Sequence, residues 1–285
     1  MVRRRAHGFT LVELVIVLVL IGVIAGVLIM QLRPALQSYL AVGRRANLVN
    51  QADAALHRIV TDVHAAVPNS LRIVPAASAG VQCLELVPTK AGGRYRTGPA
   101  LDAAQGDARP FDPQNPTQAF DVMTELQAER DDVFVVGNEN GGDVYAGVNR
   151  ALIDTVAPAP AAGGAVRVTL KNAAPFPSSY EAGRFLVVAK DQQVVGYACV
   201  QAGRGPDGSG TGILYRTVRS FDSNLACPLA GQPPVLATRV GDCAFVYNVN
   251  GGATQQSGYL QLRLGLADGG ESATLTMGAH VENVP

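Results

Sequence analysis

The sequence predicts an α+β fold in which a long N-terminal helix packs on an antiparallel β-sheet head. Three patterns support this prediction: an apolar run near the N-terminus, apolar residues at helical spacing as far as residue 67, and apolar–polar alternation near the C-terminus. A helix repeats its faces every 3.6 residues and a strand every two, so the first two patterns indicate helix and the third indicates half-buried strands.

Composition favours a β-rich domain and disfavours nucleic acid as a partner. The chain has 23 basic and 23 acidic residues, so it has no broad positive field. Its 31 glycines and 17 prolines suit many turns, and only 16% of its 285 residues are charged. The sequence contains neither G-x-S-x-G nor H-E-x-x-H, and we expect no catalysis, metal or cofactor. A membrane-anchored periplasmic enzyme remains the alternative from another class.

The apolar run has the length of a membrane helix. Residues 14–30, extended by 9–12 and by Leu32, exceed the roughly 20 residues that cross a bilayer core. Arg3, Arg4 and Arg5 precede the run and predict a cytoplasmic N-terminus. The apolar run is not followed by an A-x-A-like cleavage site, which disfavours an ordinary secretory signal. An uncleaved single-pass anchor remains an alternative interpretation.

Glu13 is the one acidic residue in this run. A carboxylate at the bilayer centre costs about 2.5–3.5 kcal/mol, and less near an end, so it implies a partner. No Lys or Arg occurs between residues 9 and 31. A free α-amino group, created by cleavage before Phe9, would lie one helical turn from Glu13 and be largely protonated at neutral pH, with a pKa of about 7.7–8.0.

The N-terminal motif resembles that of type IV prepilins and type II secretion pseudopilins. The shared residues are a basic leader, Gly8, Phe9, Thr10, Leu11 and Glu13, followed by the apolar run. The resemblance implies that a prepilin peptidase cuts after Gly8 and methylates Phe9. It also implies that Glu13 meets the N-terminal amine of a neighbouring subunit during assembly.

These features divide the chain into a leader at 1–8, a membrane and assembly helix at 9–32, an amphipathic helix at 33–67 and a periplasmic head at 68–285. Leu56, Ile59 and Val63 recur at helical spacing, and Pro68 is expected to end the helix. The resemblance predicts the same lollipop-like design. His57 and His64 are interpreted as surface residues, because two helical turns separate them too far to share one metal ion.

Short apolar runs predict the strands of the head. The loop at 203–212 lacks a phosphate-binding ending and offers only Asp207 as a calcium ligand, so we interpret it as a turn. Long loops are expected at 91–118 and 157–164. The predicted strands are 81–87, 133–136, 165–170, 185–189, 194–200, 213–218 and a hairpin spanning 260–281 whose turn includes Asp268-Gly269-Gly270.

The cysteines are Cys83, Cys199, Cys227 and Cys243. None forms a C-x-x-C pair, and an even number in an exported domain favours disulfides. Four cysteines allow three pairings, among which the sequence cannot decide. We favour Cys199–Cys227, which would close the segment between neighbouring strands, together with Cys83–Cys243.

Segments of the head resemble the minor pilins of mannose-sensitive hemagglutinin (MSHA) pili. They are CLELVPTKAGGRYR, FPSSYEAGRFLVV, VGYACV and LQLRLGLADGGESATLTMGAHVENVP. This resemblance implies a subunit that initiates or caps a type IV pilus used in surface attachment. Its expected partners are other minor and major pilins, the prepilin peptidase and the inner-membrane assembly platform, and its expected places are the inner membrane and the pilus tip. A J-class pseudopilin of type II secretion is the alternative.

Overall fold

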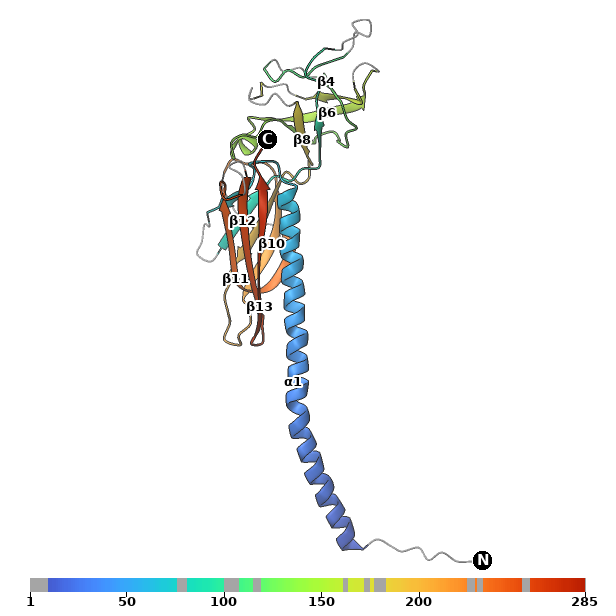
Figure 1. Cartoon of the computed structure of the whole chain (residues 1–285), viewed down its shortest axis with the longest axis vertical. Coiled ribbons are helices and arrows are strands. Elements are labelled where there is room, and N and C mark those ends of the chain that lie inside the picture. The colour runs from blue at the N-terminus through green and yellow to red at the C-terminus, as the bar shows by residue number, and fades with distance from the viewer. Residues whose placement is uncertain are drawn as a thin grey trace, which may run out of the picture. The chain divides into compact units, whose positions relative to one another are not determined.

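A computed structural model describes residues 10–75, 81–99, 108–114, 119–160, 164–171, 175–176, 183–224, 229, 233–252 and 257–284. The chain forms two compact units, Met1–Asn47 and Leu48–Pro285. Helix α1 (Leu11–His64) contributes to both units, and the strands all belong to the second (Figure 1). The α+β class predicted from the sequence is confirmed.

The first part of α1 has an entirely exposed apolar surface. Every residue from 11 to 40 is exposed, including Leu11 at 78% and Met30 at 79%. By length and composition, α1 is able to cross a membrane. Leu32, Leu36 and Leu40 belong to this exposed part, so the predicted amphipathic packing does not begin there.

Packing of α1 on the head begins at Leu48. Leu48, Leu56, Ile59 and Val63 are buried in the main hydrophobic core, where they meet the inner faces of the strands. The helix ends at His64, earlier than the predicted residue 67. After His64 the backbone forms hydrogen bonds with the segment that follows β2, in the manner of paired strands. Val67 N donates to Val87 O over 2.8 Å, and Thr89 N donates to Ala65 O over 2.7 Å.

Seven of the described strands form an antiparallel sheet that packs on the part of α1 from Leu48 onward. The order across the sheet is β1-β2-β9-β10-β11-β12-β13. Apolar residues on its inner face, such as Leu84, Tyr197 and Leu262, complete the main core with α1. The strands are β1 (Arg72–Val74), β2 (Val81–Leu86), β9 (Val194–Val200), β10 (Gly212–Arg219), β11 (Val235–Asn248), β12 (Ser257–Asp268) and β13 (Glu271–Glu282).

Strands β12 and β13 form a hairpin, which confirms the prediction made from the alternation of apolar and polar residues in the C-terminal segment. Leu262 lies opposite Met277 and Leu264 lies opposite Leu275, so the apolar residues share one face. Gly269 and Gly270 form the turn with φ of 55° and 86°. Positive φ at both positions matches the turn that suits the right-handed twist of paired strands, and glycine adopts it without steric cost.

A second sheet of six described strands has the order β3-β8-β5-β6-β7-β4. Phe111, Phe120, Phe134, Phe176 and Phe185 meet on one face, with ring centroids 4.7–6.0 Å apart. The opposite face contributes Val133, Val135 and Val188 to a cluster that includes residues beside α1 and β2. The elements are β3 (Ala91–Arg94), β4 (Ala119–Val122), β5 (Val133–Val135), the short helix α2 (Asp143–Ala146), β6 (Arg150–Pro158), β7 (Val166–Leu170) and β8 (Arg184–Val188).

Two of the predicted loops contain strand residues. The predicted loop at 91–118 begins with β3, and the one at 157–164 begins with the last residues of β6. Both segments are paired with another strand: Gly92 is opposite Leu186 of the distant β8, and Ala157 is opposite Arg167 of β7, the next strand in the chain. Pairing with these partners overrides the weak strand propensity of alanine and glycine.

The favoured disulfide pairing is wrong, because Cys199 is bonded to Cys243 with their Cα atoms 6.5 Å apart. Strand β10 begins at Gly212 opposite Val240, and β11 continues beyond that point. The continuation approaches β2 and β9: Phe245 N donates to the Gln82 side chain over 2.9 Å, and Gln82 lies opposite Cys199. Cys83 is also disulfide-bonded. Cys227 lies outside the described residues.

Candidate functional site

Thr10 caps the start of α1. The backbone N–H of Glu13 donates to Thr10 Oγ1 over 3.3 Å, and Leu14 N donates to Thr10 O over 3.2 Å. Threonine followed three residues later by glutamate is the pattern of a helix capping box, in which the threonine oxygen binds a free amide of the first turn. The T-x-x-E spacing of Thr10 and Glu13 is the one feature of the sequence that indicates this role.

Glu13 is exposed in the first turn of α1. The helix dipole favours a negative charge at this end. Among the described residues, no side chain forms an ion pair with Glu13, and its helix neighbours are exposed apolar residues. The described residues therefore supply no cation to Glu13. Gly8 and Phe9 lie outside the described residues, so their proposed processing roles remain predictions.

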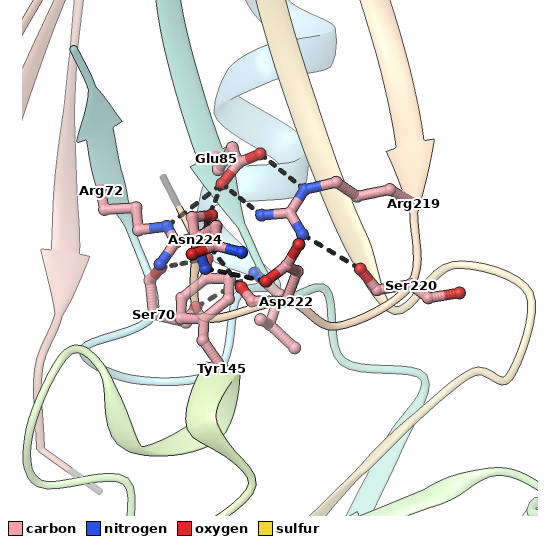
Figure 2. Close-up of polar contacts among 9 residues, drawn as sticks. Ser70, Arg72, Glu85, Tyr145, Arg219, Ser220, Asp222 and Asn224 are labelled. Carbon is pink, nitrogen blue, oxygen red and sulfur yellow. Dashed lines mark hydrogen bonds and ion pairs between the residues drawn. The ribbon is translucent and has the colours of Figure 1, made fainter. Parts of the chain in front are cut away.

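A buried ion cluster in the head surrounds Glu85 of β2 (Figure 2). The Glu85 side chain is 2% exposed and accepts four hydrogen bonds. Arg72 donates through Nε over 3.1 Å and Nη2 over 2.9 Å, and Arg219 donates through Nε and Nη2, each over 2.9 Å. Hydrogen bonds from both guanidinium groups satisfy the carboxylate, and the bond to Glu85 raises the pKa of Arg219.

Tyr145 closes the same cluster from α2. The Arg72 guanidinium lies 3.6 Å from the centroid of its ring, within the range of a cation–π interaction. Its hydroxyl donates to Ser70 O over 2.7 Å, and burial raises its pKa. Because Glu85, Arg72 and Tyr145 come from β2, β1 and α2, the cluster joins the seven-stranded sheet to the short helix that lies between β5 and β6 in the chain. No signal beyond a charged residue in the apolar run at 81–87 could have predicted it.

A second polar cluster fixes α1 to the main sheet. Asp62 of α1 accepts the Tyr197 hydroxyl over 2.5 Å and Arg216 Nε over 3.1 Å, while Arg58 Nη2 lies 3.4 Å from its other oxygen. Burial, and then the bond to Asp62, raise the pKa of Tyr197. In both clusters the buried carboxylate already accepts hydrogen bonds from neighbouring side chains. We therefore interpret both clusters as structural links between elements of the head.

The residues considered for metal binding are engaged locally. His57 Nδ1 lies 3.2 Å from Asp53 Oδ1, one helical turn away. Asp207 accepts the N–H of Ser209 over 3.1 Å, which lowers the pKa of Asp207, and Gly205 N closes the turn on Ser209 O over 2.8 Å. Within the described ranges, no group of three or more His, Cys, Asp or Glu could hold a metal ion.

Comparison with protein families identifies the N-terminal segment. Residues 3–29 match the family model described as "Prokaryotic N-terminal methylation motif". No curated protein and no solved structure matches the chain. The motif supports a pilin or pseudopilin-like class, in which processing by a prepilin peptidase and assembly with other pilins are implied. Together with the apolar part of α1, the motif fits a membrane-anchored, single-pass protein.

Proposed function

We propose that the protein is a minor pilin of the MshO type, which helps to initiate or cap an MSHA-type type IV pilus used in surface attachment. It acts through contacts with other subunits and not by catalysis. The observation that carries the proposal is Glu13: an exposed carboxylate on an apolar helix, unpaired among the described residues, within a segment that matches the methylation motif.

The proposed assembly step follows from the position of this carboxylate. Cleavage after Gly8 creates the α-amino group of Phe9, which is largely protonated at neutral pH because its pKa is about 7.7–8.0. The amine of a neighbouring subunit pairs with Glu13 and removes the cost of a lone carboxylate in lipid, which is about 2.5–3.5 kcal/mol at the bilayer centre. The exposed apolar residues beside Glu13 then pack on neighbouring helices.

N-terminal sequencing of the membrane-extracted protein tests the processing step. We expect N-methylated Phe9 as the first residue. A sequence that begins with Met1 would refute the assignment to the pilin class, whichever machine is involved.

Glu13→Ala tests the assembly step. We expect cleavage to proceed and incorporation into filaments to fall roughly tenfold or more, since a loss of about 1.4 kcal/mol already gives a factor of ten. Immunoblotting of sheared filaments and of the membrane fraction measures both. Val12→Ala is the matched control, because it shortens a neighbouring exposed side chain without changing charge. Normal incorporation of Glu13→Ala would remove the proposed charge pair.

A J-class pseudopilin of type II secretion is the second candidate, because the same N-terminal motif serves both machines. Gene deletion distinguishes the two. Loss of surface pili supports the minor pilin, whereas intact pili with blocked export of secreted proteins supports the pseudopilin.

A further inference from the structure

A cavity of the head, with a volume of about 440 Å³, lies where the end of α1 meets the second sheet. Its walls come from the last turn of α1 and the residues that follow it, from β5 and β8, and from the C-terminal end of β13. Ligand pockets in proteins commonly have volumes of roughly 300–1,000 Å³. The lining that matters here consists of Val67, Val135 and Leu186, which are apolar, and His64, Arg184 and Glu282, which are ionisable.

Arg184, which lines this cavity, lies beside a second arginine on the neighbouring strand. In the antiparallel pairing of β3 with β8, Arg94 is directly opposite Arg184. Directly opposite residues share a sheet face, with Cβ atoms about 4.5–5.5 Å apart, and like charges in such a pair are destabilising. Leu186, two residues along β8, faces the same side and lines the cavity with Arg184. The two positive charges therefore lie on the sheet face to which Leu186 also belongs, and Arg184 brings one of them to the cavity.

Neither arginine is neutralised within the described part of the head. Both are exposed, and neither has an ion pair or side-chain hydrogen bond with another group of the chain. His64 is also exposed, and its side chain has no ion pair or hydrogen bond with another described group. Two other exposed arginines of the head, Arg130 and Arg263, each face an aspartate at 2.8–2.9 Å. Arg94 and Arg184 are thus two neighbouring exposed arginines that have no carboxylate partner among the described residues.

We propose that this cavity is a docking site for an acidic peptide segment of another pilin-like subunit, which places an apolar side chain on Leu186 and Val135 and a carboxylate between Arg94 and Arg184. The inference rests on the proposed function, since it names a contact by which the head selects its neighbour. Charge complementarity determines the occupant: a carboxylate accepts hydrogen bonds from guanidinium groups and relieves their mutual repulsion.

Glu282 determines the orientation of the segment. It lines the same cavity from β13 and carries the opposite charge to Arg184. A carboxylate beside Glu282 would be repelled, so the acidic residue of the partner occupies the side of β3 and β8. Replacing this cation pair by anions should therefore abolish binding, and an inverted charge on the partner should restore it.

Site-specific photo-crosslinking in piliated cells tests the proposal. The full-length protein carries a benzophenone amino acid at Leu186, and crosslinked peptides are identified by mass spectrometry. We expect a crosslink to a segment of another pilin-like subunit that contains Asp or Glu within a few residues. In the Arg94→Glu/Arg184→Glu background its yield should fall roughly tenfold, because like charges then oppose contact. Exchanging the identified acidic residue for Lys should restore the yield.

The matched control is Arg130→Glu/Arg263→Glu, which makes the same change in net charge at exposed positions outside the cavity. It should leave the crosslink unchanged. Formation of the Cys199–Cys243 bond in each variant verifies that the head is folded, and Arg184→Ala provides a milder variant if the reversal fails to fold. An unchanged yield in the double reversal, or a crosslink to lipid or to a segment lacking acidic residues, would overturn the proposal.

The result is separable from that of the proposed function. If Glu13→Ala is lost from filaments while Arg94→Glu/Arg184→Glu keeps its crosslink and its incorporation, the docking site is refuted and the pilin assignment stands. If Met1 remains the N-terminus, the pilin assignment itself fails.

Discussion

Glu85 shows how a single residue can organise the head. It is a charged residue in a buried strand, and its two arginine partners are 14–15% exposed. Glu85→Ala would leave both guanidinium groups without their carboxylate, and breaking a buried ion pair costs about 3–5 kcal/mol. We expect a fall of that size in the free energy of unfolding, measured by urea denaturation. Glu139→Ala, at an exposed carboxylate, should change stability by less than about 0.5 kcal/mol; equal effects would contradict the role of the cluster.

The lowered pKa of Asp132 predicts how the free energy of unfolding of the head depends on pH. Its side chain is 1% exposed; burial opposes its charge, but hydrogen bonds from Lys90 and from the amides of Glu129 and Lys190 outweigh burial and lower its pKa. A carboxyl with a lowered folded pKa stabilises the protein above its unfolded pKa, about 3.9, and this stabilisation disappears as the pH falls through the folded value.

Asp132→Asn should therefore lower the melting temperature at pH 6–7 and have a smaller effect near pH 3. Thermal unfolding across this pH range measures the difference. A variant curve parallel to that of the wild type would show that Asp132 contributes nothing to acid sensitivity. Asp191→Asn, at an exposed carboxyl, is the control.

At the scale of elements, α1 combines two surfaces that the sequence does not separate. Leu36 and Leu56 occur in similar leucine-rich helical patterns, yet Leu36 is 61% exposed and Leu56 is fully buried. Leu56→Ala should reduce the stability of the head by about 2–5 kcal/mol, because it leaves a cavity in the core. Leu36→Ala should leave the urea midpoint of the detergent-solubilised protein unchanged. Similar losses in the two variants would contradict the packing described here.

The elements that could be predicted from sequence are those with local patterns. The limits of β9 were predicted as observed because Val194–Val200 is continuously apolar, and β13 followed from its alternation. Strand β11 was missed although it spans Val235–Asn248, because its register shifts between Val240 and Asp242 and its burial pattern is irregular. Strand β3 was missed because Ala-Gly-Gly-Arg has little strand propensity and depends on β8.

The same limit applies to the candidate sites. Glu13 could be recognised from the sequence because it is the one acidic residue of an apolar run and lies within the segment that matches the methylation motif. The clusters around Glu85 and Asp62 could not be predicted, because Arg219 and Arg216 are separated from them by 134 and 154 residues. The pair of Arg94 and Arg184 likewise depends on the register of β3 and β8. Interactions distant in sequence require the fold before they can be seen.

At the scale of the whole molecule, the bond between Cys199 and Cys243 joins strands on either side of β10. It closes a loop with a sequence separation of 44 residues, and the chain-entropy model gives about 4 kcal/mol for a loop of this size. Cys199→Ala and Cys243→Ala should each lower the free energy of unfolding by about 4 kcal/mol. Non-reducing peptide mapping of the wild type should recover the two cysteines in one linked peptide pair.

The double variant decides whether the two residues share one bond. If they do, Cys199→Ala/Cys243→Ala should be little less stable than either single variant, because the second substitution removes no further crosslink. Additive losses would mean that each cysteine stabilises the head through a different partner, as the pairing favoured from the sequence requires. The bond at Cys83 remains intact in all three variants, so reduction of the wild type should destabilise the head more than any of them.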